Sequence, residues 1–190
     1  MFEGGEAAGK STQARLLAEH LGAILTREPG GTAIGEALRL QLLDPQFPRP
    51  VPRAETLMML AARAQHVAEV IEPALARGRD VVCDRYSGST LAYQGYGRGL
   101  DVAGLVALDS WASGGREPDL VVLLDVPVEL ARARRREEPA DRFEGEGDEF
   151  LTRVLAGFRQ LAAADPLRWR MVDGAGTVQE VALRVREAVG

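Results

Sequence analysis

Residues 4–11 read Gly-Gly-Glu-Ala-Ala-Gly-Lys-Ser and match G-x-x-x-x-G-K-[ST], the pattern of phosphate-binding loops. Small residues let backbone N–H groups approach phosphate oxygens, and a helix behind the loop directs its positive end there. Lys10 could reach the β- and γ-phosphates, and the Ser11 hydroxyl could bind the bridging Mg²⁺. The predicted ATP site comprises Gly4, Gly5, Glu6, Ala7, Ala8, Gly9, Lys10, Ser11 and Thr12.

A glycine-rich turn before an ordinary helix is the alternative explanation of this motif. The helical spacing of Ala14, Leu17, Ala18 and Leu21 behind it favours the phosphate loop. Glu6, inside the loop, has two open roles. It is either a solvated acid or an acceptor for a substrate hydroxyl beside the phosphates, and the spacing does not choose between them.

Arginines after two strand candidates indicate a second anion site. Arg27 follows residues 23–26, and Arg85 follows residues 81–83. Because the carboxyl ends of parallel strands meet at one edge of a sheet, two guanidinium groups there could clamp one phosphate. Asp84 ends the second apolar run and could hold Mg²⁺ through water. Surface ion pairs are the alternative, but two such strand ends downstream of a phosphate loop favour the anion site.

Two side chains of the helical stretch 57–71 have alternative interpretations. Arg63 is either a surface arginine with a buried stem or a base-recognising donor in a pocket. His66 is expected to be a surface or core histidine rather than a catalyst, since an ionised phosphate acceptor has little need of a general base.

A basic cluster occupies residues 132–136, where four of the five residues are arginine. In isolation this pattern is typical of a solvated helix face. A transferring phosphoryl group, however, needs its charge neutralised and water excluded, and the phosphate loop contains no arginine. We therefore expect a mobile lid over about residues 132–147 that supplies this arginine.

Short apolar segments alternate with helical stretches, which predicts a doubly wound parallel α/β sheet with helices on both faces. Strands are expected at 23–26, 81–83, 120–124 and 170–172. Helices are expected behind the phosphate loop, near residues 38–42, over 57–71 with a bend or last turns at Pro73, and over 101–113, 128–136, 149–163 and 178–188. Only three residues precede Gly4, so either the first strand is short or the chain begins upstream.

Composition restricts the classes of function. The 190 residues suit one domain, and a net charge of -5 disfavours a general nucleic-acid binder. Cys83 is the only cysteine, so no internal disulfide can form. No leader and no apolar run of about 18 residues is evident. We therefore expect a cytoplasmic protein whose partners are small molecules, not nucleic acid or a membrane.

Several segments, in order along nearly the whole chain, resemble the thymidylate kinase family. They are 2–4 (FEG) with 9–12 (GKST), 26–32 (TREPGGT), 84–86 (DRY), 89–99 (STLAYQGYGRG), 123–127 (LLDVP) and 141–144 (DRFE). The phosphate loop alone is shared by many families. The TREPGGT and AYQG strings are much more specific.

The resemblance implies a P-loop nucleoside-monophosphate kinase fold, 1–190 as a single domain, and transfer of a phosphoryl group from ATP to dTMP. It also implies Mg²⁺ as cofactor, a homodimer, and the bacterial type of enzyme whose catalytic arginine lies in the lid. The implied catalytic residues are Lys10, Arg85, Arg136 and Arg142. The implied substrate residues are Glu6, Arg27, Met59, Arg63, Arg85, Ser89, Thr90, Tyr93 and Gln94, and the implied metal residues are Ser11 and Asp84.

Within that set the resemblance implies separate tasks. Arg27 and Arg85 would bind the dTMP phosphate, and Arg63 would hydrogen-bond the thymine. Glu6 would contact the sugar 3′-hydroxyl, and Tyr93 would occupy the place of a ribose 2′-hydroxyl.

Two residues depart from the family pattern. Ala7 stands where the family usually has glycine, which is unfavourable if the position needs a positive φ. Met59 stands where a phenylalanine commonly stacks on thymine. One alternative function is a kinase for another pyrimidine monophosphate, against which Tyr93 and Arg63 argue. Another is a catalytically degenerate P-loop nucleotide-binding protein, supported only by Ala7 and the short first strand.

Overall fold

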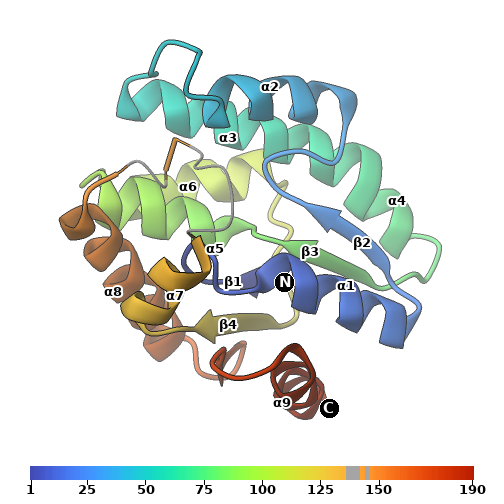
Figure 1. Cartoon of the computed structure of the whole chain (residues 1–190). Helices are drawn as coiled ribbons and strands as arrows, with labels where there is room; N and C mark the ends of the chain where they lie inside the picture. The colour runs from blue at the N-terminus through green and yellow to red at the C-terminus, as the bar shows by residue number, and fades with distance from the viewer. Residues whose placement is uncertain (136–141, 144–145) are drawn as a thin grey trace.

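The computed structural model describes residues 1–135, 142–143 and 146–190. Five strands form one parallel sheet in the order β2-β3-β1-β4-β5. Figure 1 shows β2, β3, β1 and β4 side by side in this order. The strands are β1 (Phe2–Glu3), β2 (Ile24–Arg27), β3 (Val81–Asp84), β4 (Val121–Asp125) and β5 (Trp169–Asp173). The predicted doubly wound α/β fold is confirmed, and each predicted strand lies within two residues of its expected bounds.

Strand β1 is short but central. Its Phe2 pairs with Asp84 of β3 on one side and with Val122 of β4 on the other. Pairing on both sides satisfies its backbone polar groups, so two residues suffice to position the loop that follows at its carboxyl end.

Helices flank the sheet. They are α1 (Lys10–Leu21), α2 (Ala33–Leu43), α3 (Pro52–His66), α4 (Glu72–Leu75), α5 (Ser87–Thr90), α6 (Val102–Ala112), α7 (Val128–Arg135), α8 (Asp148–Ala164) and α9 (Val178–Val189). Two π-helical segments, η1 (Val67–Ile71) and η2 (Leu91–Gly97), continue α3 and α5. No helix in the described ranges is long and apolar enough to cross a membrane.

The helical stretch around Pro73 differs from a uniform α-helix. The chain stays helical from α3 through η1 into α4, but the turn ahead of Pro73 widens to π geometry. Proline has no N–H to donate, and its ring crowds the carbonyl four residues earlier, so the preceding turn must rearrange. The predicted bend is thus realised as a change of helical pitch.

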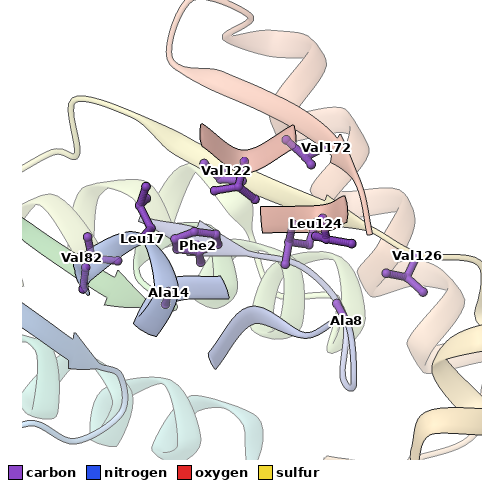
Figure 2. Packing of buried hydrophobic residues seen from close by; sticks show 12 residues of the cluster. Phe2, Ala8, Ala14, Leu17, Val82, Val122, Leu124, Val126 and Val172 are labelled. Atoms are coloured by element: carbon purple, nitrogen blue, oxygen red, sulfur yellow. The ribbon is translucent and has the colours of Figure 1, made fainter. Parts of the chain in front are cut away.

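The alternation of side chains along β4 separates two halves of the core. Val122 and Leu124 point to one face, where they pack with Phe2, Leu17 and Val172 under α1 and α9 (Figure 2). Leu123 points to the other face and packs in a second cluster with residues of η2 and α8. Because both faces are covered, β4 is a continuous apolar run, as parallel strands are. The carboxyl ends of β1, β2 and β3 remain accessible at one edge.

Candidate functional site

A cavity of about 510 Å³ opens at the carboxyl ends of β1, β2 and β3. All nine side chains predicted to bind substrate line it, together with the predicted metal residues Ser11 and Asp84 and with Lys10. Sequence reasoning did not assign a role to seven further residues of the lining, namely Glu28, Pro29, Arg39, Leu43, Tyr86, Arg134 and Phe143. The cavity therefore brings together segments as distant in sequence as residues 6 and 143.

The loop between β1 and α1 forms one wall. Lys10 begins α1 and donates from Nζ to the Gly5 carbonyl at 2.6 Å. Burial, and then the charge of Arg85, lower the pKa of its ammonium. Gly4 has φ 143°, and a Cβ there would lie 2.6 Å from the Leu124 carbonyl oxygen, so only glycine fits. Gly4, Gly5 and Ala8 do not line the cavity; they shape the loop from behind.

Ala7 has φ 54°, the left-handed conformation that favours glycine. A residue with a Cβ pays roughly 1–2 kcal/mol in that region. The concern raised by the sequence is therefore confirmed: the alanine is strained where the family usually has glycine.

Replacing Ala7 by glycine is expected to raise the free energy of unfolding by about 0.5–1 kcal/mol, since relief of the strain exceeds the added chain entropy of glycine. Urea unfolding measures the change. Ala8→Gly is the matched control: Ala8 is buried and its φ is not positive, so the same substitution there is expected to destabilise. An Ala7→Gly variant less stable than the parent would contradict the strain.

Glu6, Arg85 and Tyr93 form a compact group at the centre of the cavity. Glu6 Oε1 accepts from Arg85 Nη2 at 2.5 Å and from the Tyr93 hydroxyl at 2.6 Å. Burial alone would raise the pKa of Glu6, but the Arg85 and Lys10 charges and these two hydrogen bonds lower it to about 2. Glu6 is therefore a carboxylate at neutral pH. The second guanidine nitrogen of Arg85 donates to the Gly4 carbonyl and to Ser89.

Arg85 itself adopts φ 71°, a second left-handed residue at the site. Strained backbone of this kind persists when the surroundings hold it firmly, and it recurs at binding sites. Here the contacts of the guanidinium with Gly4, Glu6 and Ser89 keep Arg85 in this conformation.

Arg27, the last residue of β2, lines the same cavity as Arg85, which follows the neighbouring strand β3. Nη2 of Arg27 lies 2.9 and 2.8 Å from the two carboxylate oxygens of Glu36 on α2. The two arginines predicted to bind the phosphate thus line one cavity, because β2 and β3 are neighbouring parallel strands. Each of the two arginines is paired with a carboxylate.

Asp84 and Ser11 meet beside the phosphate loop. The Ser11 hydroxyl donates to Asp84 Oδ2 at 2.5 Å. The other carboxylate oxygen, Oδ1, is buried and has no hydrogen-bond partner among the described residues. A buried carboxylate oxygen without a donor suits a hard cation such as Mg²⁺. The described ranges hold no group of three His, Cys, Asp or Glu side chains that could bind a metal by itself.

Arg63 lines the cavity and is only 3% exposed. It pairs with Glu28, the residue after β2, and with Asp109 on α6, and it donates to the Thr90 hydroxyl at 3.0 Å. Glu28 also contacts Nδ1 of the buried His66, whose Nε2 meets the Thr26 hydroxyl. The expectation that His66 is a core histidine, not a catalyst, agrees with this burial.

Sequence reasoning assigned no role to Glu28 or Asp109. Asp109 is the single acid in the otherwise apolar helix α6, and a buried carboxylate requires a partner. That pattern signalled an ion pair but not its partner, which lies 46 residues away.

A second buried ion pair holds the η2 segment against α3. Gln94 donates to Glu55 of α3 at 2.9 Å, and Glu55 pairs with Arg98. The Arg98 guanidinium lies over the ring of Phe143, which packs edge-on against Tyr93 at 5.4 Å between ring centroids. Phe143, from the end of the predicted lid, thereby forms part of the cavity wall.

The predicted lid arginines are differently placed. Arg136 lies outside the described residues. Arg142 does not line the cavity: its guanidinium donates to the carbonyls of Asp44, Phe47 and Pro48 in the loop after α2. Arg134 does line the cavity and donates to the Gly174 carbonyl at 3.0 Å.

Comparisons with known proteins agree with this geometry. The family model described as thymidylate kinase matches residues 2–185. A thymidylate kinase of Desulfovibrio desulfuricans is 48% identical, with 99% of this chain and 93% of that protein covered. One from a Synechococcus species is 50% identical over the same shares. The crystal structure of thymidylate kinase from Ehrlichia chaffeensis superposes with a TM-score of 0.83 at 31% identity and covers 100% of this chain and 96% of that one.

Proposed function

The chain belongs to the thymidylate kinase family and catalyses ATP-dependent phosphorylation of dTMP to dTDP, and from this premise we propose which residues carry out each part of the reaction. The observation that carries the proposal is the convergence of Lys10, Arg27, Arg63 and Arg85 on one cavity. Residues 1–190 act as one kinase domain, with residues 132–147 as its lid.

ATP binds with its phosphates in the loop 4–12, where Lys10 neutralises charge on the transferring group. Ser11 and Asp84 would hold Mg²⁺, which would supply positive charge to neutralise the phosphates. The hydrogen bond from Ser11 to Asp84 and the unpartnered Asp84 Oδ1 support this assignment.

The dTMP phosphate binds between Arg27 and Arg85. It takes the place of the Glu36 carboxylate at Arg27 and of the Glu6 carboxylate at Arg85. Glu6 accepts a hydrogen bond from the 3′-hydroxyl, a role that its low pKa supports because a carboxylate is a strong acceptor. Tyr93 lies beside Glu6 and leaves no place for a 2′-hydroxyl. The ionised phosphate of dTMP attacks the γ-phosphorus in line with the departing ADP, so no covalent enzyme intermediate and no general base are required.

The thymine binds beside Arg63 in the cavity. Arg63 donates to the base, Met59 packs on its ring, and Ser89, Thr90 and Gln94 surround it; all five line the cavity. Replacing phenylalanine by methionine at position 59 keeps an apolar, polarizable contact with the ring at the cost of rigidity.

A coupled assay of ADP release with Mg-ATP and dTMP, dUMP, the ribose form of TMP, CMP and AMP tests the proposal. We expect turnover with dTMP well above the others. Preference for CMP would contradict the assigned roles of Tyr93 and Arg63, because CMP has a 2′-hydroxyl and an amino group at C4. Nucleotide binding without turnover would favour a degenerate module.

We further propose that the working form is a cytoplasmic homodimer that joins through α3 and α6. These neighbouring helices expose several apolar side chains, among them Leu57, Val106 and Trp111, the last 83% exposed. Apolar side chains gathered on one face are typical of protein interfaces.

Sedimentation equilibrium is expected to give twice the chain mass of 20.5 kDa. Trp111→Asp should shift the protein towards monomer, because it places a charge in the apolar interface. Leu167→Asp is the matched control: Leu167 is 86% exposed and belongs to neither helix. A monomeric parent protein, or equal effects of both substitutions, would contradict the interface.

A further inference from the structure

Arg63 is held from two sides by carboxylates that belong to other elements. Its Nε donates to Glu28 Oε2 at 2.8 Å, and Nη2 lies 2.7 Å from the same oxygen. Its Nη1 donates to the Thr90 hydroxyl and to Asp109 Oδ1. A guanidinium has five N–H donors, two of them on Nη1. These contacts occupy the Nε–H donor and both N–H donors of Nη1. A ligand must therefore accept its hydrogen bond from Nη2.

The two carboxylates hold different nitrogens of the guanidinium. Glu28 lines the substrate cavity with Arg63. Asp109 does not line that cavity; it lines a second cavity of about 210 Å³, with Ser110 and Leu91. The Arg63 guanidinium also lies over the ring of Tyr86, with Cζ 4.8 Å from the centroid. Its plane and its rotation are therefore both fixed before any ligand binds.

A fixed guanidinium distinguishes acceptors from donors. The oxygen of a pyrimidine with a carbonyl at C4 can accept a hydrogen bond from the remaining N–H of Arg63. A pyrimidine with an amino group at C4 would instead place its own hydrogen-bond donor against that N–H. A site built to make a hydrogen bond rejects the analogue that cannot make it, because its buried polar group is left unpaired. A guanidinium free to rotate could turn its donors away and lose this rejection.

We propose that Asp109 is a positioning residue that sets selectivity for the C4 carbonyl of the pyrimidine, by holding Nη1 of Arg63 from outside the substrate cavity. Asp109 does not touch the substrate. The proposal rests on the role of Arg63 in binding the base, and it adds the residue that makes Arg63 selective.

The test compares Asp109→Ala, Asp109→Asn and the parent protein with dTMP, dUMP and dCMP in the ADP-release assay. For Asp109→Ala we expect KM for dTMP to rise about ten-fold or more, with kcat within about three-fold. The same factor should appear for dUMP, which shares the C4 carbonyl, and not for dCMP. The ratio of kcat/KM between dTMP and dCMP should therefore fall about ten-fold. Asp109→Asn keeps the acceptor Oδ1 and should restore most of the ratio.

Leu105→Ala is the matched control for stability. Leu105 is buried on the same helix and its side chain has no polar atom that could hold the Arg63 guanidinium, so this variant should unfold more easily yet keep the parent selectivity. All variants are compared at a temperature where circular dichroism shows them folded. Equal losses for all three nucleotides, or the same change in selectivity in Leu105→Ala, would overturn the proposal and leave Asp109 a structural residue. Loss of dTMP preference in the parent itself would instead reject the proposed role of Arg63.

Discussion

Replacing Lys10 by alanine is expected to lower kcat by about 10³-fold or more, while the dissociation constant for dTMP stays within about three-fold. In the proposed mechanism the ammonium stabilises charge that develops on the transferring phosphoryl group, and removing one such interaction from a preorganised site costs orders of magnitude in rate. The acceptor is held by other residues, so its binding changes little. The ADP-release assay gives kcat, and calorimetry gives the affinity for dTMP.

Two further variants make this test specific. Arg15→Ala removes another cation from α1, but Arg15 is exposed and paired with Glu19, so kcat should not change. Lys10→Arg keeps the charge and should still be slow, because a planar guanidinium does not replace a compact ammonium. A Lys10→Ala enzyme that retained more than a tenth of the parent kcat would remove Lys10 from the mechanism.

The second large effect is expected for the double variant Arg136→Ala/Arg142→Ala, which should also lose about 10³-fold or more in kcat. The described arginines of the substrate cavity are assigned to dTMP, apart from Arg39 and Arg134, which donate to backbone carbonyls. The arginine that neutralises the transferring group is therefore expected from the lid. Normal turnover in the double variant would disprove the lid assignment.

The two single variants are expected to lose different shares of kcat. Because Arg142 donates to three carbonyls of the loop after α2, we expect Arg136→Ala to carry the larger share of the loss in kcat. Arg142→Ala should in addition raise KM for dTMP, since it releases the chain beside Phe143, part of the cavity wall. Arg132→Ala is the control: Arg132 is exposed and paired with Asp148, outside the cavity. A loss in Arg132→Ala equal to that in Arg136→Ala would show that net charge, not position, matters.

The strands, the phosphate loop and the arginines at two strand ends could be predicted from local patterns, whereas Met59, Ser89, Thr90, Tyr93 and Gln94 were expected in the site only through the family resemblance. A buried parallel strand such as β4 is a continuous apolar run, and its carboxyl end must lie at the sheet edge where the loop 4–9 lies. Once β2 and β3 are adjacent, Arg27 and Arg85 have to approach each other. The roles of the cavity residues remain predictions until the variants are measured.

What the sequence did not reveal depends on contacts between distant elements. The partner of Arg63 could have been any of several acids, and only the packing of α6 against α3 selects Asp109. The π-helical turns of η2, which packs against α8, likewise have no residue signature in the sequence. Arg142 was expected at the phosphates from its motif alone. Nothing in the sequence around it indicates that its guanidinium donates to the loop after α2.

Lys10 is the only lysine in the sequence; every other basic side chain apart from two histidines is an arginine. The amine of the phosphate loop is therefore chemically unique among the side chains. A sample grown with ¹⁵N-labelled lysine carries the label in one residue, so its spectrum contains a single side-chain ammonium signal, from the phosphate loop. Amine-directed reagents have the same single side-chain target. The protein thus contains a spectroscopic reporter in the wall of its cavity without any substitution.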